Sequence, residues 1–308
     1  MKTSASELTA LVFGNLREIY MRRVPYARRY VELVSGMGGS FVPDHLAFRT
    51  FNTTTGEQPA GIRAIGHLLK TLNYRKSGTY RFEKQKLSAV HYEHTEGIFP
   101  KIFVSQLEVE ELPEWAGKII HEVVDESPYL MSDMAIELMN CLASDGCLNE
   151  EAAEILSVEM TGYFRRPWKM PSWESMLKIN DISQYAAWVL LHGNSVNHFA
   201  ALVNQQQTPV WPDLEATCNG LIRAGIPMKK EIEGEEGGLL RQSATMPVVE
   251  SYLFPGMEGE EKEMEWTYAY FELTERGWSH GGDTPRLFQG FVTDQARHLF
   301  KMTQTRIN

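Results

Sequence analysis

The chain has 308 residues, 43% of them hydrophobic, which is enough to bury one large core or two modest ones. Its formal net charge of −10 argues against nucleic acid or an anionic membrane as the main partner. The N-terminal region lacks the apolar run of a secretory signal, and no segment approaches the length of a membrane span. We therefore expect a cytoplasmic protein, for which small-molecule substrates remain open.

Residues 4–34 are predicted to be helical, because Ser4 and Glu7 match a capping box and apolar residues recur at helical spacing. The stretch FVPDHLAFRTFN, residues 41–52, reads as a short buried strand. It is followed by a helical pattern, GIRAIGHLLKTLNY, and by three strand candidates, TYRFEKQ, LSAVHYEH and KIFVSQLEV. After an N-terminal helix within residues 1–36, residues 37–111 are thus predicted to form a βαβββ module.

The pattern becomes helical over residues 112–193, which we interpret as an inserted helical block. A second βαβββ module is predicted over residues 194–280, and a C-terminal segment over residues 281–308 completes one catalytic domain spanning residues 1–308. The elements of the second module are a strand SVNHFAALVN, a helix WPDLEATCNGLIRAG, and strands KKEIEG, LLRQSATMP and EWTYAYFELTER.

Weak internal repetition links the two modules. DHLAFRTFN and NHFAALVN both begin with a polar residue and a histidine and end in asparagine, and pairing Leu107 with Leu273 puts Gln106 opposite Glu272. Repeats of this kind indicate a duplicated unit. We therefore predict an α+β fold in which two βαβββ modules form an incomplete barrel.

If the opening and closing strands of the modules surround one cavity, His45, His198 and Glu272 converge there, and Gln106 takes the symmetry-related fourth place. Two imidazoles and one carboxylate with open positions form the facial triad typical of non-haem Fe(II) oxygen chemistry. Zinc or manganese fits the same ligands, so the pattern indicates a metal site more firmly than it indicates iron.

Other residues compete for these roles. Glu275 is an alternative carboxylate, but alternation along the strand favours Glu272, which shares a face with Trp266, Tyr268 and Tyr270. His198 as a core histidine, or Glu272 as an ion-pair partner of Arg276, are purely structural alternatives. The remaining histidine candidates, His91, His94 and His192, are expected to have solvated roles, and Cys141, Cys147 and Cys218 are expected to be reduced and structural.

Arg49 lies on the same predicted strand face as His45, with its Cα about 13 Å further along. An arginine pointing back from there could hold an anion several ångströms from a metal. This arrangement suits a dicarboxylate that chelates the metal through a 2-oxo acid end and offers its far carboxylate to the guanidinium.

The segments DHLAFRTF, VNHFA, YFELTERG and RLFQGFVTDQARHLFKM together resemble the 2-oxoadipate dioxygenase/decarboxylase family, within the vicinal oxygen chelate group, over nearly the whole chain. The resemblance implies an Fe(II) enzyme that converts 2-oxoadipate and O2 to 2-hydroxyglutarate and CO2 in lysine catabolism. It also implies His45, His198 and Glu272 as metal ligands and Arg49 as the residue that binds the substrate carboxylate.

Two other classes of function stay open at this point. One is another metal enzyme of the same architecture, such as a glyoxalase-like isomerase or a ring-cleaving dioxygenase, although an aromatic diol does not need a cationic anchor such as Arg49. The other is a metal-free protein that binds a small molecule. The sequence also leaves open the exact 2-oxo acid, the oligomeric state, the role of the helical insertion, and any contribution of Gln106, Glu275 or Arg286 to the site.

Overall fold

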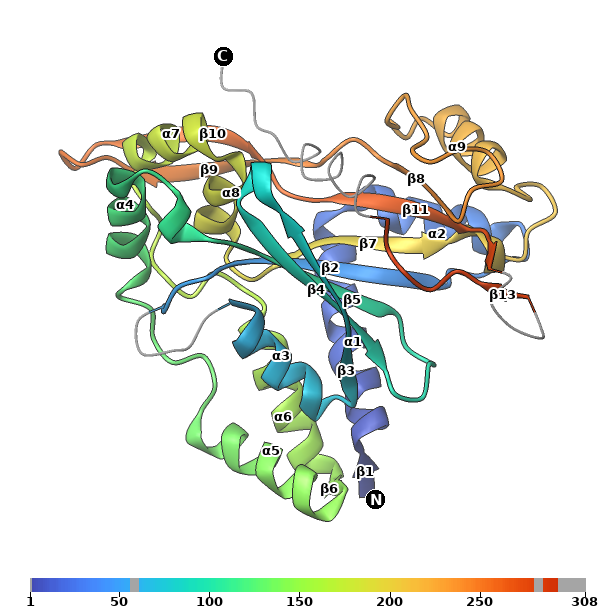
Figure 1. Cartoon of the computed structure of the whole chain (residues 1–308), viewed down its shortest axis with the longest axis horizontal. Coiled ribbons are helices and arrows are strands. Elements are labelled where there is room, and N and C mark those ends of the chain that lie inside the picture. Colours follow the sequence, from blue (N-terminus) through green and yellow to red (C-terminus); the bar gives the residue numbers. More distant parts are fainter. Residues whose placement is uncertain (1, 56–60, 280–284, 293–308) are drawn as a thin grey trace. The chain divides into compact units, whose positions relative to one another are not determined.

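The computed structural model describes residues 2–55, 61–279 and 285–292 (Figure 1). The chain folds into two compact units, and each unit combines segments that are distant in the sequence. The first unit comprises Met1–Tyr20, Ala47–Val196 and Glu250–Trp266, and the second comprises Met21–Leu46, Asn197–Val249 and Thr267–Asn308.

The sheet of the first unit has the strand order β3-β4-β5-β2, and β3, β4 and β5 are antiparallel neighbours. Helix α3 connects β2 to β3, as the predicted βαβββ order requires. The turn after β3 uses the short η1 helix and a left-handed Lys86. The bounds are β2 Pro43–Phe51, α3 Gly61–Thr71, β3 Tyr74–Phe82, η1 Glu83–Gln85, β4 Leu87–His94 and β5 Lys101–Leu107.

After β5, helices form most of the first unit's chain over residues 109–192. Four of them begin at a serine or asparagine whose side chain accepts a hydrogen bond from a backbone amide three residues later, at Ser132, Asn149, Ser172 and Ser183. The elements are η2 Val109–Glu111, α4 Glu114–Val124, α5 Asp133–Asp145, α6 Glu150–Tyr163, α7 Trp173–Ile182 and α8 Gln184–His192, with β6 Cys147–Asn149 paired to β1 Lys2–Ser4.

The N-terminal region forms two helices where the sequence predicts one. The predicted capping box is present, since the Ser4 amide donates to Glu7 at 2.7 Å, but α1 Ala5–Arg23 ends before Pro25 and α2 Pro25–Gly36 begins there. Proline has no N–H to donate and its ring clashes with the preceding turn, so it starts a new helix. The boundary between the units lies close to this break, inside the last turn of α1 after Tyr20, and α2 belongs wholly to the second unit.

The sheet of the second unit has the order β2-β7-β11-β8, where β2 contributes its first residues, β7 and β11 are parallel, and β8 is antiparallel to β11. Helices α2 and α9 both contact β11 (Figure 1). Among the described strands, the edge strands β3 and β8 do not pair with each other. The sheet is therefore open, in agreement with the predicted incomplete barrel. The bounds are β7 Val196–Leu202, η3 Val203–Gln205, α9 Leu214–Arg223, β8 Leu240–Ala244 and β11 Tyr270–Arg276.

Two strand predictions for this region are wrong in detail. Residues 229–234 form an isolated bridge at Glu233 opposite Gln242 instead of a strand. The stretch EWTYAYFELTER contains the end of one strand and the whole of another, β10 Glu261–Thr267 and β11. Strand β10 pairs with β9 Val249–Pro255 in a separate hairpin, most of which belongs to the first unit.

The described part of the C-terminal region is short. Its last strand pair is β12 Trp278–Ser279 with β13 Arg286–Leu287. Most of the predicted C-terminal segment, residues 293–308, lies outside the described residues.

Within the described ranges, no helix is long and apolar enough to cross a membrane.

Candidate metal centre

Three central strands of the second unit bring the predicted ligands together. His45 lies on β2, His198 on β7 and Glu272 on β11, and their exposed fractions are 2%, 6% and 0%. The segments around them are buried on both faces, with β7 buried at every position. A polar side chain in such a strand must find a polar partner or bind a ligand, because leaving it unpaired is costly.

The three side chains converge on a single point. The Nε2 atoms of His45 and His198 are 3.3 Å apart, and Glu272 reaches them with Oε1 at 3.4 Å from His45 and Oε2 at 3.6 Å from His198. One ligand atom from each residue lies within 4.8 Å of the others. Since metal–nitrogen bonds are about 2.1 Å long, two Nε2 atoms at this separation could bind the same metal ion.

The residue before each histidine fixes its ring. The Nδ1 atom of His45 lies 2.8 Å from Asp44 Oδ2, and that of His198 lies 3.1 Å from Asn197 Oδ1. Both partners are oxygen atoms, so Nδ1 donates in each case and the neutral ring presents the Nε2 lone pair. Two facing lone pairs cannot bond to each other, whereas a cation between them binds both.

The Glu272 carboxylate has one oxygen that could bind the same cation. Its Oε1 accepts hydrogen bonds from Gln242 and from the Thr274 hydroxyl, but Oε2 is buried without a hydrogen bond. Burial, with smaller effects from the charges of Glu233 and Asp44, raises the pKa of Glu272 to about 8. A divalent cation offsets both the burial and the negative neighbours, so these residues fit a metal ion.

Asp44 is itself held by a buried charge pair. Burial alone raises the pKa of a carboxyl group, but the hydrogen bonds and charge of Arg276 keep the pKa of Asp44 well below its usual range. Asp44 therefore remains an anion that accepts the Nδ1 proton of His45. Carboxylate–histidine pairs of this kind raise the basicity of a metal-binding imidazole.

Comparison with known proteins identifies the family of this chain. Residues 12–306 match the family described as 2-oxoadipate dioxygenase/decarboxylase. The chain belongs to this family. Among curated relatives, the rice 2-oxoadipate dioxygenase/decarboxylase is 26% identical over 84% of this chain and 67% of its own length. The Arabidopsis thaliana protein of the same name is 23% identical over 88% and 69%. The predicted family and the predicted class of activity are thus confirmed.

Solved structures of similar proteins confirm the fold. A protein assigned to the glyoxalase superfamily from Ralstonia eutropha has a TM-score of 0.84 at 25% identity, covering 94% of this chain and 87% of that one. The rice hydroxyglutarate synthase, solved with 2-oxoadipate, has a TM-score of 0.74 at 22% identity, covering 97% and 93%. The names of both plant relatives place those proteins in plastids, and the cytoplasmic location of this family member stays a prediction.

Arg49 lies in the first unit, on the second half of β2, and is 3% exposed. Its guanidinium carbon is 5.1 Å from the ring centres of both Tyr185 and Trp188 on α8. Tyr185 is anchored in turn by its hydroxyl, which donates to the Ser105 carbonyl at 2.7 Å. Arg49 is therefore a buried cation with two aromatic neighbours of defined orientation.

The competing residues are engaged elsewhere. Glu275 accepts from the Leu214 amide at the start of α9 and pairs with Arg241 at 2.8 Å. Gln106 accepts from the Ile62 amide at 2.9 Å at the start of α3. Arg286 is exposed on β13. The carboxylate beside the two histidines is thus Glu272, as strand alternation predicts.

The prediction that three other histidines are solvated is wrong. His91, His94 and His192 are 5%, 3% and 4% exposed. His91 bonds to the Tyr80 hydroxyl at 2.8 Å, and the His192 ring packs against Trp188 with 4.8 Å between ring centres. Aromatic neighbours bury these imidazoles, which a polar sequence context does not reveal. The three cysteines are free, as predicted.

Among the residues that contact the ligands or their partners, the sequence did not predict the roles of Asp44, Asn197, Gln242 and Arg276; from the sequence, Arg276 is a candidate partner of Glu272 only, whereas it pairs with Asp44. The first two left a signal, since each histidine directly follows an Asp or Asn. The other two left none, because Gln242 and Arg276 meet their partners 30 and 232 residues away in the sequence.

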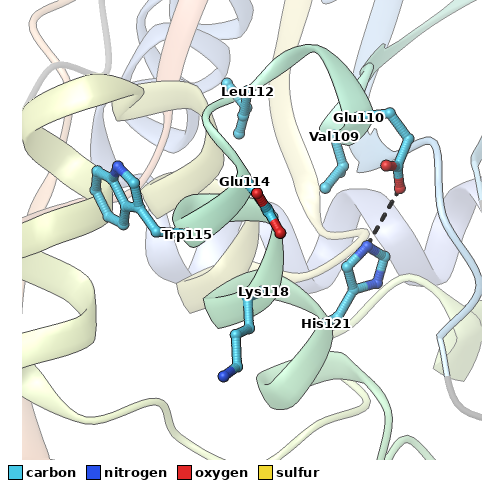
Figure 2. A pocket seen from close by; sticks show the side chains of 8 residues that line it. Val109, Glu110, Leu112, Glu114, Trp115, Lys118 and His121 are labelled. Atoms are coloured by element: carbon cyan, nitrogen blue, oxygen red, sulfur yellow. Dashed lines mark hydrogen bonds and ion pairs between the residues drawn. The ribbon is translucent and has the colours of Figure 1, made fainter.

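The first unit also has two surface grooves whose linings include none of the predicted ligands. The larger, of about 770 Å³, lies along η2 and α4, where His121 Nε2 is 3.3 Å from Glu110 Oε1 (Figure 2). The smaller, of about 330 Å³, is lined by residues of α3, α5 and α6, including His67 and Tyr163. Neither groove explains the buried ligand cluster.

Proposed function

We propose that this chain is an Fe(II)-dependent enzyme that converts 2-oxoadipate and O2 to 2-hydroxyglutarate and CO2, in the cytoplasm and as part of lysine catabolism. The supporting observation is a buried His-His-Glu cluster in a member of the 2-oxoadipate dioxygenase/decarboxylase family. Ligand sets of this type are typical of non-haem iron oxygenases. The complex of the rice relative with 2-oxoadipate supports the proposed substrate.

The proposed ligands are His45, His198 and Glu272. Bound iron supplies the redox chemistry between O2 and the 2-oxo acid. The protein holds the ligands on strands and excludes water from the cluster. The Nδ1–H groups of the two imidazoles donate hydrogen bonds to Asp44 and Asn197, which leaves each Nε2 lone pair for the metal. Because the described residues supply three such ligands, a bound metal would have further positions for the substrate.

Arg49 is proposed to bind the far carboxylate of the diacid. A guanidinium offers two parallel N–H groups that match a carboxylate, and it is charged at every relevant pH. The aromatic rings of Tyr185 and Trp188 restrict its orientation, which lowers the entropy lost when a substrate binds. This role makes Arg49 the residue that selects diacids over monoacids.

An oxygen-electrode screen tests the proposal. Protein purified anaerobically and loaded with Fe(II) is mixed with 2-oxo diacids of five to seven carbons and with matched 2-oxo monoacids, and CO2 and the hydroxy acid are measured. We expect O2 uptake and CO2 release in equal amounts, fastest with the six-carbon diacid. Turnover without O2 would indicate an isomerase, and iron-independent binding of the diacid without turnover would indicate a binding protein.

A further inference from the structure

Arg276, the last residue of β11, uses its buried guanidinium in two directions. Towards β2 it forms a fork with Asp44, with Nε 2.5 Å from Oδ1 and Nη2 2.8 Å from Oδ2. Towards the C-terminal side its Nη1 donates to the carbonyls of Phe288 and Gly290, each at 2.9 Å. The side chain is 1% exposed, so all of these bonds form away from water.

Both sets of partners of Arg276 also contact His45, through Asp44 on one side and through Phe291 on the other. Asp44 accepts the Nδ1 proton of this histidine, as described above. Beyond Gly290, the ring of Phe291 meets the His45 ring edge to face, with 5.1 Å between centres, and the Arg276 guanidinium carbon is 5.5 Å from the Phe291 ring centre. His45 is thus held by a carboxylate and an aromatic ring that both depend on one arginine.

The backbone of Arg276 is fixed independently of these contacts. Its amide donates to Asn204 Oδ1 at 2.7 Å, and its carbonyl accepts from Asn204 Nδ2 at 3.1 Å. The backbone position of Arg276 is therefore fixed, and its guanidinium in turn fixes Asp44 and the carbonyls of Phe288 and Gly290.

We propose that Arg276 is a positioning residue of the metal centre, which holds His45 in its binding orientation through Asp44 and seats residues 288–291 against the same ring. The inference rests on the proposed metal site and assigns a role to a residue that does not itself reach the ligand cluster. A lysine cannot replace it, because one ammonium lacks the fork that spans a carboxylate and two carbonyls.

His45 should depend on Arg276 more than His198 does, because the two histidines are held by different partners. Asn197 holds His198 through a neutral amide oxygen, whereas Asp44 holds His45 through a carboxylate that needs a buried cation beside it. Loss of the fork leaves a buried carboxylate without its partner, which loosens His45 more than it loosens the rest of the unit.

The test measures metal release, not turnover. Wild-type protein and Arg276→Lys are loaded with Co(II), and the decay of the Co(II) absorption is followed in excess EDTA. We expect Arg276→Lys to release Co(II) roughly tenfold faster or more, the effect usual for a partner that orients a metal ligand. The matched control is Arg241→Lys, since Arg241 also pairs with carboxylates in the same unit, those of Glu215 and Glu275. We expect its release rate to match wild type.

Two further variants separate positioning from general stability. Asp44→Asn keeps an acceptor for His45 but removes the charge pair, and we expect it to release Co(II) as fast as Arg276→Lys does. Phe291→Ala should also speed release, and combining it with Arg276→Lys should give less than the product of the two single effects, because both act through the same segment.

The contrary results are distinct. Equal Co(II) release by Arg276→Lys and Arg241→Lys, with an equal loss of thermal stability in the metal-free proteins, would show that Arg276 only supports the fold. A wild-type rate for Phe291→Ala would remove residues 288–291 from the proposal. Wild-type protein that binds no Co(II), or His45→Ala protein that keeps it, would instead overturn the metal site itself.

Discussion

Corresponding strand positions in the two units carry polar side chains whose hydrogen bonding differs. Gln106 near the end of β5 and Glu272 on β11 occupy matching places in the internal repeat, but Gln106 is half-buried whereas Glu272 is fully buried. The Gln106 amide is satisfied within the first unit, by the Ile62 amide at 2.9 Å and by Glu108 at 3.1 Å. Glu272 instead keeps one buried oxygen without a hydrogen bond and faces two imidazoles.

This difference separates a structural polar residue from a ligand. A satisfied amide stabilises the start of a helix and needs nothing further. A buried carboxylate with one oxygen that accepts no hydrogen bond, beside two Nε2 lone pairs, has the donor set that binds a cation. The second unit therefore contains the proposed metal chemistry, while the corresponding position in the first unit serves its fold.

The largest expected effect comes from making the second unit resemble the first. Glu272→Gln keeps the shape of the side chain but removes its negative charge, so the site should lose its metal and turnover of 2-oxoadipate should fall by about 10³-fold or more, as when a whole metal-dependent reaction is lost. Steady-state O2 uptake after Fe(II) loading measures this. Retained activity in Glu272→Gln would assign the carboxylate role to another residue.

Removing the proposed substrate anchor of the first unit should have the next largest effect. Losing the cationic partner of a buried carboxylate costs about 2 to 5 kcal/mol, so Arg49→Ala should lower kcat/KM for a 2-oxo diacid by roughly 30-fold or more. Arg49→Lys should keep its iron but lose turnover as well. Matched 2-oxo monoacids serve as the control, and an equal loss on both substrate types would show that Arg49 supports the fold.

A change at Gln106 should alter stability without altering the metal. Gln106→Leu preserves most of the volume but removes the acceptor for the Ile62 amide, which should cost about 2 kcal/mol in the free energy of unfolding. Urea unfolding measures the cost, and the iron content of the folded protein should equal that of wild type. Loss of iron in this variant would give Gln106 a place in the site after all.

The smallest effect is expected at the rejected carboxylate. Glu275→Gln weakens a partly exposed pair with Arg241 and a contact at the start of α9, so it should reduce stability by about 1 kcal/mol. Thermal unfolding and 2-oxoadipate turnover together check this. Turnover should be unchanged, and a large drop would reopen the choice between Glu275 and Glu272.

The sequence predicts those parts of the fold and site that depend on local pattern. Strand alternation places Glu272, not Glu275, with the histidines, and the repeated polar residue before each histidine predicts where the buried strands begin. It fails where one apolar run belongs to two elements. Tyr268 and Ala269, between β10 and β11, contain no glycine or proline to mark the turn, so the two strands read as one.

Long-range partners are the other part that sequence does not reveal. Arg276 is 232 residues from Asp44, and before folding nothing distinguishes it from an arginine at the end of a solvated strand. Its partner is decided by strand order in the sheet, where β11 and β2 both neighbour β7. Only the assembled sheet shows which of the charged residues become buried together.

The central claim is that His45, His198 and Glu272 hold one iron ion. Anaerobic equilibrium dialysis against Fe(II), with the iron content of each protein measured afterwards, tests it most directly. We expect one iron per chain in wild type and in Glu275→Gln, and almost none in His198→Ala and Glu272→Gln. Iron retained by Glu272→Gln and lost from Glu275→Gln would contradict the assignment.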